Sequence, residues 1–480
     1  MRILLVSSEI HPYSKTGGLA DMVGALAKSL ARAGHQVGVV APLYLGVREQ
    51  FPELRLFQSL DLALGAQRVH AEIWTLEPQP GLTLYFLDQP SLYHRAGLYQ
   101  VHGVDYPDNA ERFIFFSKAA AHLAFQLDWK PELVHVHDWQ AAPTVLFIHH
   151  HSKQHAAVSP RTCITLHNLA YQGLFPANRY ALTNLPWDYF NPEGVEFYGQ
   201  MNCLKAGIVF ANAITTVSPG YAREIMGPDL GFGLEGLLRK RQSSLTGILN
   251  GVDYDEWNTT DNPHIKHPFD GDNLEGKLAN KCDLQSELGL PGDGTIPLFG
   301  SIGRLVEQKG VDIMLGALEG MLNANLQFVL LGTGEPAFEK SFEALARRFP
   351  SKAGVRIQFE TGLSHRIEAA CDFFIMPSQF EPCGLNQMYS LRYATIPIVR
   401  KTGGLDDAVV DVREDPTRAN GIKFSEYSAA ALSKAIQKAL ALYAEPESLN
   451  YFRLNAMKAD FSWERTMADY VRVYNQALGD

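Results

Sequence analysis

Short apolar runs rich in β-branched residues alternate with helical patterns along most of the chain. The runs in the first half span residues 2–8, 36–42, 82–88, 132–138, 161–167 and 212–218. Those in the second half span residues 296–303, 326–332, 355–360, 373–378 and 396–401. Because strand–helix alternation is typical of parallel sheets with crossover helices, the pattern predicts an α/β fold with two Rossmann-like, doubly wound domains.

A polar stretch without a clear period separates the two sets of runs. It covers residues 258–273, NTTDNPHIKHPFDGDN, and we interpret it as the linker region. We place the first domain at residues 1–245 and the second at residues 246–459. The last segment, residues 460–480, contains an apolar stripe that predicts an amphipathic helix.

One heptapeptide occurs almost unchanged in both halves, as KTGGLAD at residues 15–21 and as KTGGLDD at residues 401–407. A glycine pair between a strand and a helix lets the backbone approach a ligand closely, and the following helix N-terminus suits an anion. Two ordinary strand–helix turns would also explain the repeat. If the two domains face each other, a ligand would lie in the cleft between them.

Composition narrows the classes of function. Of the 480 residues, 46% are hydrophobic and 20% are charged, and the net charge of −10 argues against a nucleic-acid or anionic-membrane partner. Five scattered cysteines without a C-x-x-C pair predict neither a disulfide framework nor a cysteine zinc site. The N-terminal apolar stretch is too short for a signal peptide, and no window reaches the length of a membrane span. We therefore expect a cytoplasmic protein.

Two basic side chains follow a glycine-containing turn in the second half. The stretch GSIGRLVEQKG, residues 300–310, carries Arg304 and Lys309. Arginine can contact two phosphate oxygens at once, and lysine supplies a mobile positive charge. A solvated basic pair is the ordinary alternative, but cations at a helix N-terminus are unfavourable without an anion nearby. We therefore predict that this pair binds a diphosphate.

A carboxylate and a glycine precede another predicted helix in PSQFEPCGLNQMYSL, residues 377–391. Glu381 could cap that helix, or it could accept hydrogen bonds from sugar hydroxyl groups. The backbone N–H groups of Cys383, Gly384 and Leu385 would lie at the same place. The Cys383 thiol by itself is more typical of a packed side chain than of a nucleophile.

Polar side chains also follow two apolar runs of the first half. ELVHVHDWQAA contains His135, His137 and Asp138, and ITLHNLAYQG contains His167 and Asn168. Such polar ends of buried strands lie where sites form in parallel sheets, although a single histidine there is usually structural. Two strand ends of the same character favour a site.

Two weaker patterns keep other classes of protein open. GTGEPA, residues 332–337, fits the loose dinucleotide fingerprint G-x-G-x-x-A, and Glu360 ends the next apolar run, where a ribose-binding acid would lie. A nicotinamide-dependent dehydrogenase is therefore an alternative, although Glu335 would repel a pyrophosphate. The D-x-D patterns at residues 253–255 and 270–272 are too short to predict a metal site.

Taken in order, the motifs resemble those of bacterial and plant-type glycogen and starch synthases. They are KTGGLAD, HVHDW, LHNLAYQG, NGVD, GRLVEQKG, SQFEPCGLNQ and the second KTGGL, and the match runs over essentially the whole chain. The resemblance implies the GT-B architecture, with two facing domains, an interdomain cleft and a C-terminal helix that packs back on the first domain. It also implies a retaining glucosyltransferase that moves glucose from ADP-glucose to the non-reducing end of an α-1,4-glucan, either glycogen or a malto-oligosaccharide. No metal and no cofactor are expected.

The resemblance assigns roles to single residues of this chain. It implies that Glu381 holds the glucosyl hydroxyl groups, that His167 lies against the glucose, and that Arg304 and Lys309 bind the diphosphate. The residues implied to contact ADP-glucose are Lys15, Gly18, Asp21, Asp138, Phe359, Cys383, Gly384 and Leu385. Phe359 stands where the family often has a tyrosine against the adenine.

Two positions depart from the family's usual pattern, and at a third, Tyr389, the chain lacks an acid of related transferases that the resembled synthases lack as well. Related transferases have a second acid in an E-x7-E motif, where this chain has Tyr389, and the usual SRFEPCGLTQ reads SQFEPCGLNQ here because of Gln379 and Asn386. The lost arginine puts phosphate affinity or acceptor preference in question. A UDP-glucose-dependent glucosyltransferase, the dehydrogenase and a non-catalytic glucan-binding protein remain as alternatives.

Overall fold

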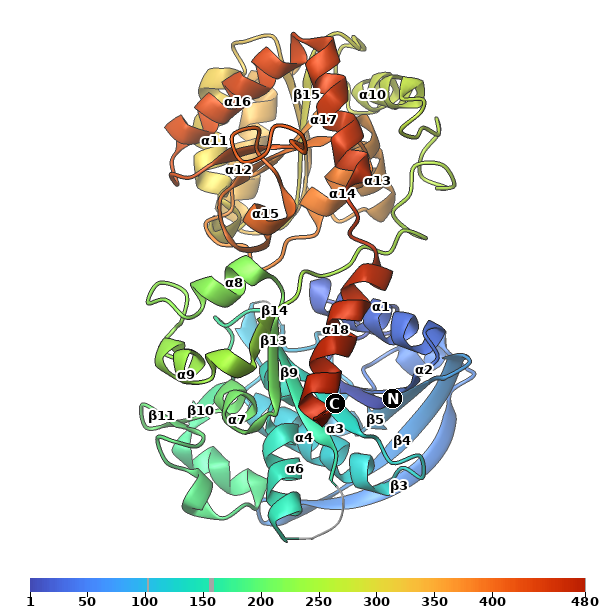
Figure 1. Ribbon diagram of the computed structural model, residues 1–480, viewed down its shortest axis with the longest axis vertical. Helices are drawn as coiled ribbons and strands as arrows, with labels where there is room; N and C mark the ends of the chain where they lie inside the picture. Colours follow the sequence, from blue (N-terminus) through green and yellow to red (C-terminus); the bar gives the residue numbers. More distant parts are fainter. Residues whose placement is uncertain (102, 155–158, 480) are drawn as a thin grey trace. The chain divides into compact units, whose positions relative to one another are not determined.

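The computed structural model describes residues 1–101, 103–154 and 159–479. The chain divides into two compact units (Figure 1). The first consists of Met1–Val217, Ala222–Gly251 and Trp463–Asp480, and the second of Ser218–Tyr221 and Val252–Ser462. Each unit is built on a parallel or mostly parallel sheet covered by helices, which confirms the predicted class of two parallel-sheet α/β domains.

The first unit contains a nine-stranded sheet in the order β14-β13-β9-β8-β1-β2-β5-β4-β3. Its strands are β1 (Arg2–Val6), β2 (Gln36–Pro42), β3 (Arg55–Leu64), β4 (Gln67–Gln79), β5 (Leu82–Asp88), β8 (Leu133–His137), β9 (Arg161–Leu166), β13 (Ala213–Thr216) and β14 (Leu245–Gly247). Neighbours from β14 to β5 are parallel, whereas β4 is antiparallel to both β5 and β3. The alternation did not predict the β3–β4 hairpin, because its strands are largely exposed and carry many polar residues.

Helices connect and cover these strands. They are α1 (Gly18–Arg32), α2 (Val47–Gln50), α3 (Pro90–Tyr93), α4 (Asn109–Gln126), α5 (Asp138–Ala141), α6 (Pro143–Gln154), α7 (Cys203–Phe210), α9 (Glu235–Lys240) and α18 (Trp463–Leu478), with 3-10 turns η1 (Ala177–Thr183), η2 (Trp187–Tyr189) and η3 (Gln242–Ser244). The first half of α8 (Pro219–Glu224) is assigned to the second unit and its last half to the first. Two small sheets lie apart from the main one. They are formed by β6 (Gln100–Val101) with β7 (Val104–Asp105), and by β10 (Leu174–Pro176), β12 (Gln200–Asn202) and β11 (Glu196–Phe197).

The last helix, α18, belongs to the first unit and lies beside α1 (Figure 1). The hydroxyl of Tyr474 hydrogen-bonds Nδ1 of His135 on β8 at 2.8 Å. Thr466 Oγ1 donates to the carbonyl of Leu249 at 3.1 Å. Residues from the far end of the chain therefore complete the packing of the first sheet.

The second unit contains a six-stranded, wholly parallel sheet in the order β17-β16-β15-β18-β19-β20. Its strands are β15 (Leu298–Ile302), β16 (Gln327–Leu331), β17 (Ala353–Arg356), β18 (Phe373–Met376), β19 (Ile396–Arg400) and β20 (Ile422–Phe424). Its helices are α10 (Glu275–Glu287), α11 (Val311–Met321), α12 (Pro336–Arg348), α13 (Thr361–Ala370), α14 (Asn386–Arg392), α15 (Gly403–Ala408), α16 (Ala429–Tyr443) and α17 (Pro446–Lys458), with the 3-10 turn η4 (Glu307–Lys309). Most core strands are continuous apolar runs, as buried parallel strands are.

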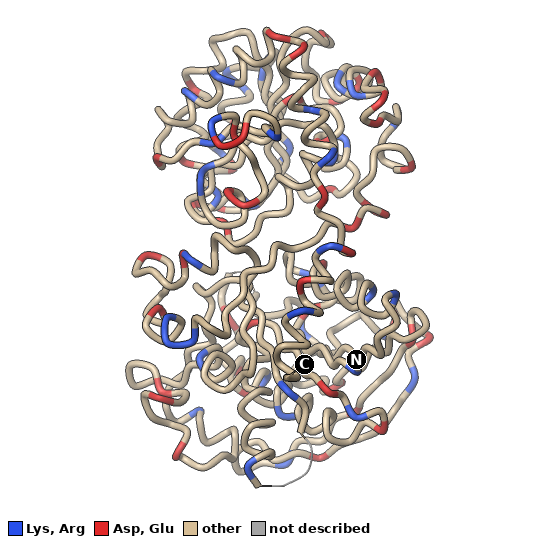
Figure 2. The backbone as a smooth tube through the Cα atoms, viewed as in Figure 1, with Lys and Arg blue, Asp and Glu red and all other residues tan. Residues whose placement is uncertain are grey.

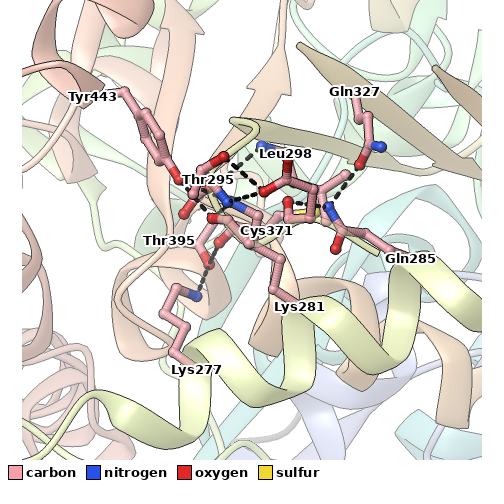
Figure 3. Close-up of polar contacts among 12 residues, drawn as sticks. Lys277, Lys281, Gln285, Thr295, Leu298, Gln327, Cys371, Thr395 and Tyr443 are labelled. Carbon is pink, nitrogen blue, oxygen red and sulfur yellow. Dashed lines mark hydrogen bonds and ion pairs between the residues drawn. The ribbon is translucent and has the colours of Figure 1, made fainter. Parts of the chain in front are cut away.

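Buried lysines fasten α10 to this sheet (Figure 3). The Lys277 ammonium donates to the carbonyl of Tyr393 at 2.8 Å and to Oγ1 of Thr395 at 2.6 Å, and burial lowers its pKa to about 7. One turn further, Lys281 pairs with Asp372 at 2.6 Å. The helix is therefore anchored by satisfied polar groups where an apolar stripe is more usual.

Two sequence interpretations need correction in the second unit. The run at residues 355–360 forms a strand only to Arg356, because the next residues turn into the start of α13. The polar stretch 258–273 is packed onto the unit, with Phe269 buried and the Asn262 amide donating to the Tyr393 hydroxyl at 3.0 Å. Its buried apolar residues are too sparse to produce a recognisable period.

Acidic and basic residues are interspersed along both units, without a long tract of one sign (Figure 2). None of the helices in the described parts of the chain has the length and apolar character needed to cross a membrane.

Candidate functional site

The first KTGGL copy forms an exposed loop at the start of α1. Lys15 lies in this loop, and its ammonium pairs with the Asp21 carboxylate at 2.7 Å. Gly17 caps α1 without a side-chain hydrogen bond, and a Cβ atom added there would meet nothing within 4 Å. Gly18 is the first helical residue. The loop thus presents a cation, two exposed glycines and a helix N-terminus to its surroundings.

The strand ends of β8 and β9 bring Asp138 and His167 together. The Asp138 carboxylate accepts the backbone N–H of His167 at 2.7 Å. Burial raises the pKa of Asp138 to about 7, while hydrogen bonds from the backbone N–H groups of His167 and Asn168 act in the opposite direction. Asp138 has a positive φ of 57°, so it forms a tight turn in a strained backbone region. It therefore fixes the path of the chain that carries His167.

His167 contacts a second imidazole. Its Nε2 lies 3.1 Å from Nδ1 of His137. Burial lowers the pKa of His167 to about 3, so the ring is neutral at physiological pH. His135, behind this pair, is held between Tyr474 and Thr165 and is structural. A neutral His167 can exchange hydrogen bonds with a sugar hydroxyl but cannot serve as a cation for a phosphate.

In the second unit, the loop after β15 meets the loop after β18. Lys309, at the end of η4, pairs with Glu381 at 2.5 Å although the two are 72 positions apart in the sequence. Glu381 is 6% exposed and also accepts from the hydroxyl of Ser378 at 3.1 Å. Gly310 turns the chain at a φ of 70°, and a Cβ there would lie 2.2 Å from the carbonyl oxygen of Pro377. The two loops can approach this closely because that position is glycine.

Further hydrogen bonds hold these two loops together. The Gln379 N–H donates to the carbonyl of Gln308 at 2.9 Å, and the Asn386 side chain donates to the carbonyl of Ile302 at 2.8 Å. The guanidinium of Arg400 on β19 donates to the carbonyls of Ser378 and Gln379. Asn386, which differs from the family's usual threonine, therefore has a structural role in joining the loops. At Gln379, which differs from the usual arginine, the guanidinium of Arg400 binds the backbone carbonyl.

The predicted turn residues Cys383, Gly384 and Leu385 lie directly before α14. Gly384 has a φ of 70°, and the Gln387 amide donates to the carbonyls of Cys383 and Gly384 at 3.0 Å each. These two hydrogen bonds fix the carbonyl side of the turn, and a role of its N–H groups toward a donor phosphate stays a prediction. Cys383 itself is buried.

Arg304 and Phe359 are more exposed members of the predicted site. The Arg304 side chain follows β15 and is exposed. Phe359 is 85% exposed and lies between β17 and α13. An aromatic ring this accessible is available as a platform for a flat ligand. The structure records no contact that brings it to Glu381.

Tyr389 is the residue that stands, by sequence spacing, where related transferases have the second acid of E-x7-E. It stacks on Trp257 with ring centroids 3.7 Å apart and planes 4° apart. Trp257 in turn stacks on His365 at 4.1 Å. Aromatic packing between α14, α13 and the segment after β14 therefore takes the place of a charged group there.

The dinucleotide alternative fits the structure poorly. The Gly334 N–H in GTGEPA is already bonded to the Glu339 carboxylate at 2.8 Å. β17 ends at Arg356, and Glu360 lies beyond it at the start of α13, paired with Arg366 at 3.1 Å. An acid for a ribose is therefore not at the strand end that the fingerprint requires. No group of three or more His, Cys, Asp or Glu side chains within the described ranges is arranged to hold a metal ion.

One polar residue of the first unit was missed by sequence reasoning. Glu9 lies just after β1 and binds Thr16 inside the first KTGGL copy. The available signal was its position, since RILLVSSEI places an acid directly after an apolar run.

Family models match both units. Residues 2–240 match the starch synthase catalytic domain, and residues 290–458 match glycosyl transferases group 1. Glycogen synthase from Anaeromyxobacter sp. (strain Fw109-5) is 44% identical over 477 residues, which cover 99% of this chain and 99% of that protein. Glycogen synthase from Thioalkalivibrio sulfidiphilus (strain HL-EbGR7) is 44% identical over 490 residues and 100% of both chains.

Solved structures agree with these matches. The catalytic domain of starch synthase IV from Arabidopsis thaliana, bound to ADP and acarbose, superposes with a TM-score of 0.90 at 34% identity over 100% of this chain and 99% of that chain. A sucrose-phosphate synthase from Thermosynechococcus elongatus shares the fold, with a TM-score of 0.61 at 17% identity over 100% of both chains.

Two parallel-sheet α/β domains with these matches define a glycosyltransferase of the GT-B class. The chain belongs to the glycogen and starch synthase family. The resemblance found in the motifs is thereby confirmed, whereas the roles of single residues and the interdomain cleft stay predictions.

Proposed function

We propose that the protein is a glycogen synthase that transfers glucose from ADP-glucose to the non-reducing end of an α-1,4-glucan with retention of configuration. The observation that carries the proposal is the pairing of Lys309 with the buried Glu381 where the loops after β15 and β18 meet. A cation for a diphosphate beside a carboxylate for sugar hydroxyls suits a nucleotide sugar. The relative bound to ADP, which is similar over the whole chain, supports adenine as the donor base.

The proposed roles of the site residues follow from the charges that develop when the bond between glucose and phosphate breaks. Breaking the bond between glucose and phosphate develops negative charge on the diphosphate, which Arg304 and Lys309 would stabilise. Glu381 would be released from Lys309 to accept hydrogen bonds from the glucosyl hydroxyls. The neutral His167 would hydrogen-bond the same sugar. Lys15, in the other unit, stays a predicted contact of the donor.

The proposed transfer needs no carboxylate nucleophile of the kind that retaining glycosidases use. The acceptor hydroxyl would attack the sugar carbon from the face that the diphosphate leaves. Its proton would pass to the departing phosphate oxygen, and the new glycosidic bond would keep the original configuration. Glu381 serves as a sugar ligand in this scheme.

The direct test is an incubation of the purified protein with glycogen and either ADP-glucose or UDP-glucose, following nucleotide release and glucan growth. Growth with ADP-glucose is expected. Growth with UDP-glucose alone would overturn the proposed donor but keep the transferase. Absence of growth with both donors would contradict the proposed reaction.

The phosphate contacts give the first mutational prediction. Arg304→Ala and Lys309→Ala should each lower kcat on the order of 10²–10³-fold, by analogy with removal of one oxyanion donor. Lys434→Ala, which removes an exposed ammonium from α16, is the matched control and should leave turnover unchanged. Full turnover in both site variants would contradict the diphosphate assignment.

A further inference from the structure

A buried carboxylate lies beneath the first KTGGL loop. Glu9 is 3% exposed and follows β1. Its Oε2 accepts the backbone N–H of Thr16 at 2.5 Å, and its Oε1 accepts the Thr16 hydroxyl at 2.6 Å. The Tyr99 hydroxyl donates to the same Oε1 at 2.6 Å. Three donors, two of them from one residue of the loop, therefore surround this carboxylate.

The charge of Glu9 is satisfied by these hydrogen bonds. In the described part of the chain, no lysine, arginine or histidine forms an ion pair with it. A buried carboxylate costs several kcal/mol unless it is hydrogen-bonded or paired. Displacement of Thr16 would remove two of these three donors and leave the buried carboxylate with the Tyr99 hydroxyl. The exposed loop is therefore held in place by a buried group that cannot easily release it.

Glu9 also reaches a second loop. Tyr99 lies between α3 and β6. Its hydroxyl donates its proton to Glu9, so in the 2.7 Å hydrogen bond between Ser8 and Tyr99 the Ser8 hydroxyl is the donor. The Tyr99 ring packs against Phe113 with centroids 5.7 Å apart. The carboxylate thus couples the loop after β1 to the loop after α3, and Tyr99 in the second loop packs against α4.

The loop that Glu9 holds is otherwise open. Residues 15–18 are exposed, and α1 begins at Gly18 without a side-chain cap. An exposed, glycine-containing loop samples many backbone conformations unless it is fixed. The two bonds from Thr16 remove this freedom directly between Lys15 and Gly17.

We propose that Glu9 is a positioning residue for glucosyl transfer. It clamps Thr16 so that the Lys15 ammonium and the N-terminus of α1 keep one orientation toward the nucleotide sugar. Glu9 contacts neither substrate, and its effect passes through Thr16 and Tyr99. This inference rests on the proposed function.

The test compares Glu9→Ala and Glu9→Gln with the wild-type chain. Glu9→Ala should lower kcat on the order of 10²-fold and raise the KM for the donor, because misplaced binding groups act on both. The KM for glycogen should stay unchanged. Glu9→Gln should recover part of the loss, because the hydroxyls of Thr16 and Tyr99 can turn and accept from the amide.

A matched control distinguishes the positioning effect of Glu9 on the loop from the general effect of removing a buried carboxylate. Asp88 is a buried carboxylate of the same unit, 6% exposed and paired with His94 at 3.0 Å. Asp88→Asn should leave the donor KM unchanged. Donor kinetics in Glu9→Ala within about twofold of wild type, or an equal loss in Asp88→Asn, would overturn the inference.

Amide hydrogen exchange gives a readout that does not depend on turnover. Exchange at residues 16–19 should accelerate in Glu9→Ala, and to a smaller extent in Glu9→Gln, while the core strand β1 keeps its protection. If Glu9→Ala does not fold, Thr16→Val and Tyr99→Phe test the clamp instead. Each variant should raise the KM for the donor, and the effect of the double variant should differ from the sum of the two single effects. Unchanged exchange at residues 16–19 together with unchanged donor kinetics in the variants would overturn the proposed role of Glu9. If the wild-type protein shows no transferase activity but loop exchange is faster in the Glu9 variants, only the proposed function is contradicted.

Discussion

The two KTGGL copies share a sequence but not an environment. In the first, residues 15–18 are exposed, and a Cβ added at Gly17 would meet nothing within 4 Å. In the second, residues 402–405 are buried, and a Cβ at Gly404 would lie 2.1 Å from the carbonyl oxygen of Cys383. Gly17 in the first copy leaves space open, whereas Gly404 in the second allows two backbone segments to touch.

The lysines of the two copies differ as well. Lys15 pairs with Asp21 inside its own heptapeptide at 2.7 Å. Lys401 pairs at 2.7 Å with Glu414, which also accepts from the buried Lys423 at 2.7 Å. The second copy is therefore part of a structural ion-pair group. A repeated motif indicates a repeated strand–helix turn, and only its surroundings decide whether that turn can receive a ligand.

Glycine substitution should produce the largest contrast. Gly404→Ala forces a methyl group into the Cys383 backbone and should lower the free energy of unfolding of the second unit by about 3 kcal/mol, the upper end of overpacking costs. Gly17→Ala has an extended φ of −163° and free space, so its cost should stay within about 0.5 kcal/mol. Urea unfolding of both variants measures this. Equal destabilisation would mean that the copies are structurally equivalent.

Removing the lysines should separate activity from stability. Lys15→Ala should lower kcat on the order of 10²-fold with a stability change below about 0.5 kcal/mol, because its ion pair is exposed. Lys401→Ala should do the reverse, with a stability loss of about 0.5–1 kcal/mol and less than about a threefold change in kcat. Steady-state kinetics and urea unfolding on the same preparations are the measurements. A large loss of kcat in Lys401→Ala would make the second copy functional too.

The smallest expected effect is a pH dependence confined to the second copy. Burial would raise the pKa of Glu414, but hydrogen bonds from the ammonium groups of Lys401 and Lys423 outweigh it and lower the pKa to about 2. The ordinary value is 4.5, so this stabilisation is complete above pH 4.5 and is lost as the pH falls toward 2.

Lys401→Ala removes one of those donors. In a plot of the unfolding midpoint against pH, the decrease at acidic pH should therefore be smaller in this variant than in the wild type. Lys15→Ala serves as the control and should leave the curve parallel to that of the wild type. A Lys401→Ala curve that is also parallel would show that Lys401 does not hold Glu414 ionised.

The alternation of apolar runs was sufficient to predict both parallel sheets, because most central strands are continuous apolar segments. It could not predict α10, since a helix buried through Lys277 and Lys281 has the composition of an exposed one. It also missed the β3–β4 hairpin, whose half-exposed strands carry no crossover helix.

The candidate site divides in the same way. Single residues in the loops that follow strands, such as Glu381 and Lys309, could be selected from the sequence because their chemistry is visible locally. Their contact could not, because it depends on β15 and β18 being neighbours in the sheet. Glu9 was missed because its partners lie 7 and 90 positions away in the chain.

The position of α18 has a consequence for how the molecule is made. This helix packs in the first unit but is translated after the whole of the second. At about 5–20 residues per second, synthesis of the intervening residues takes roughly ten to forty seconds. Throughout that interval the nascent first unit lacks its last helix, and His135 has no Tyr474 to bind. The unit whose synthesis starts first is thus the one that finishes folding last.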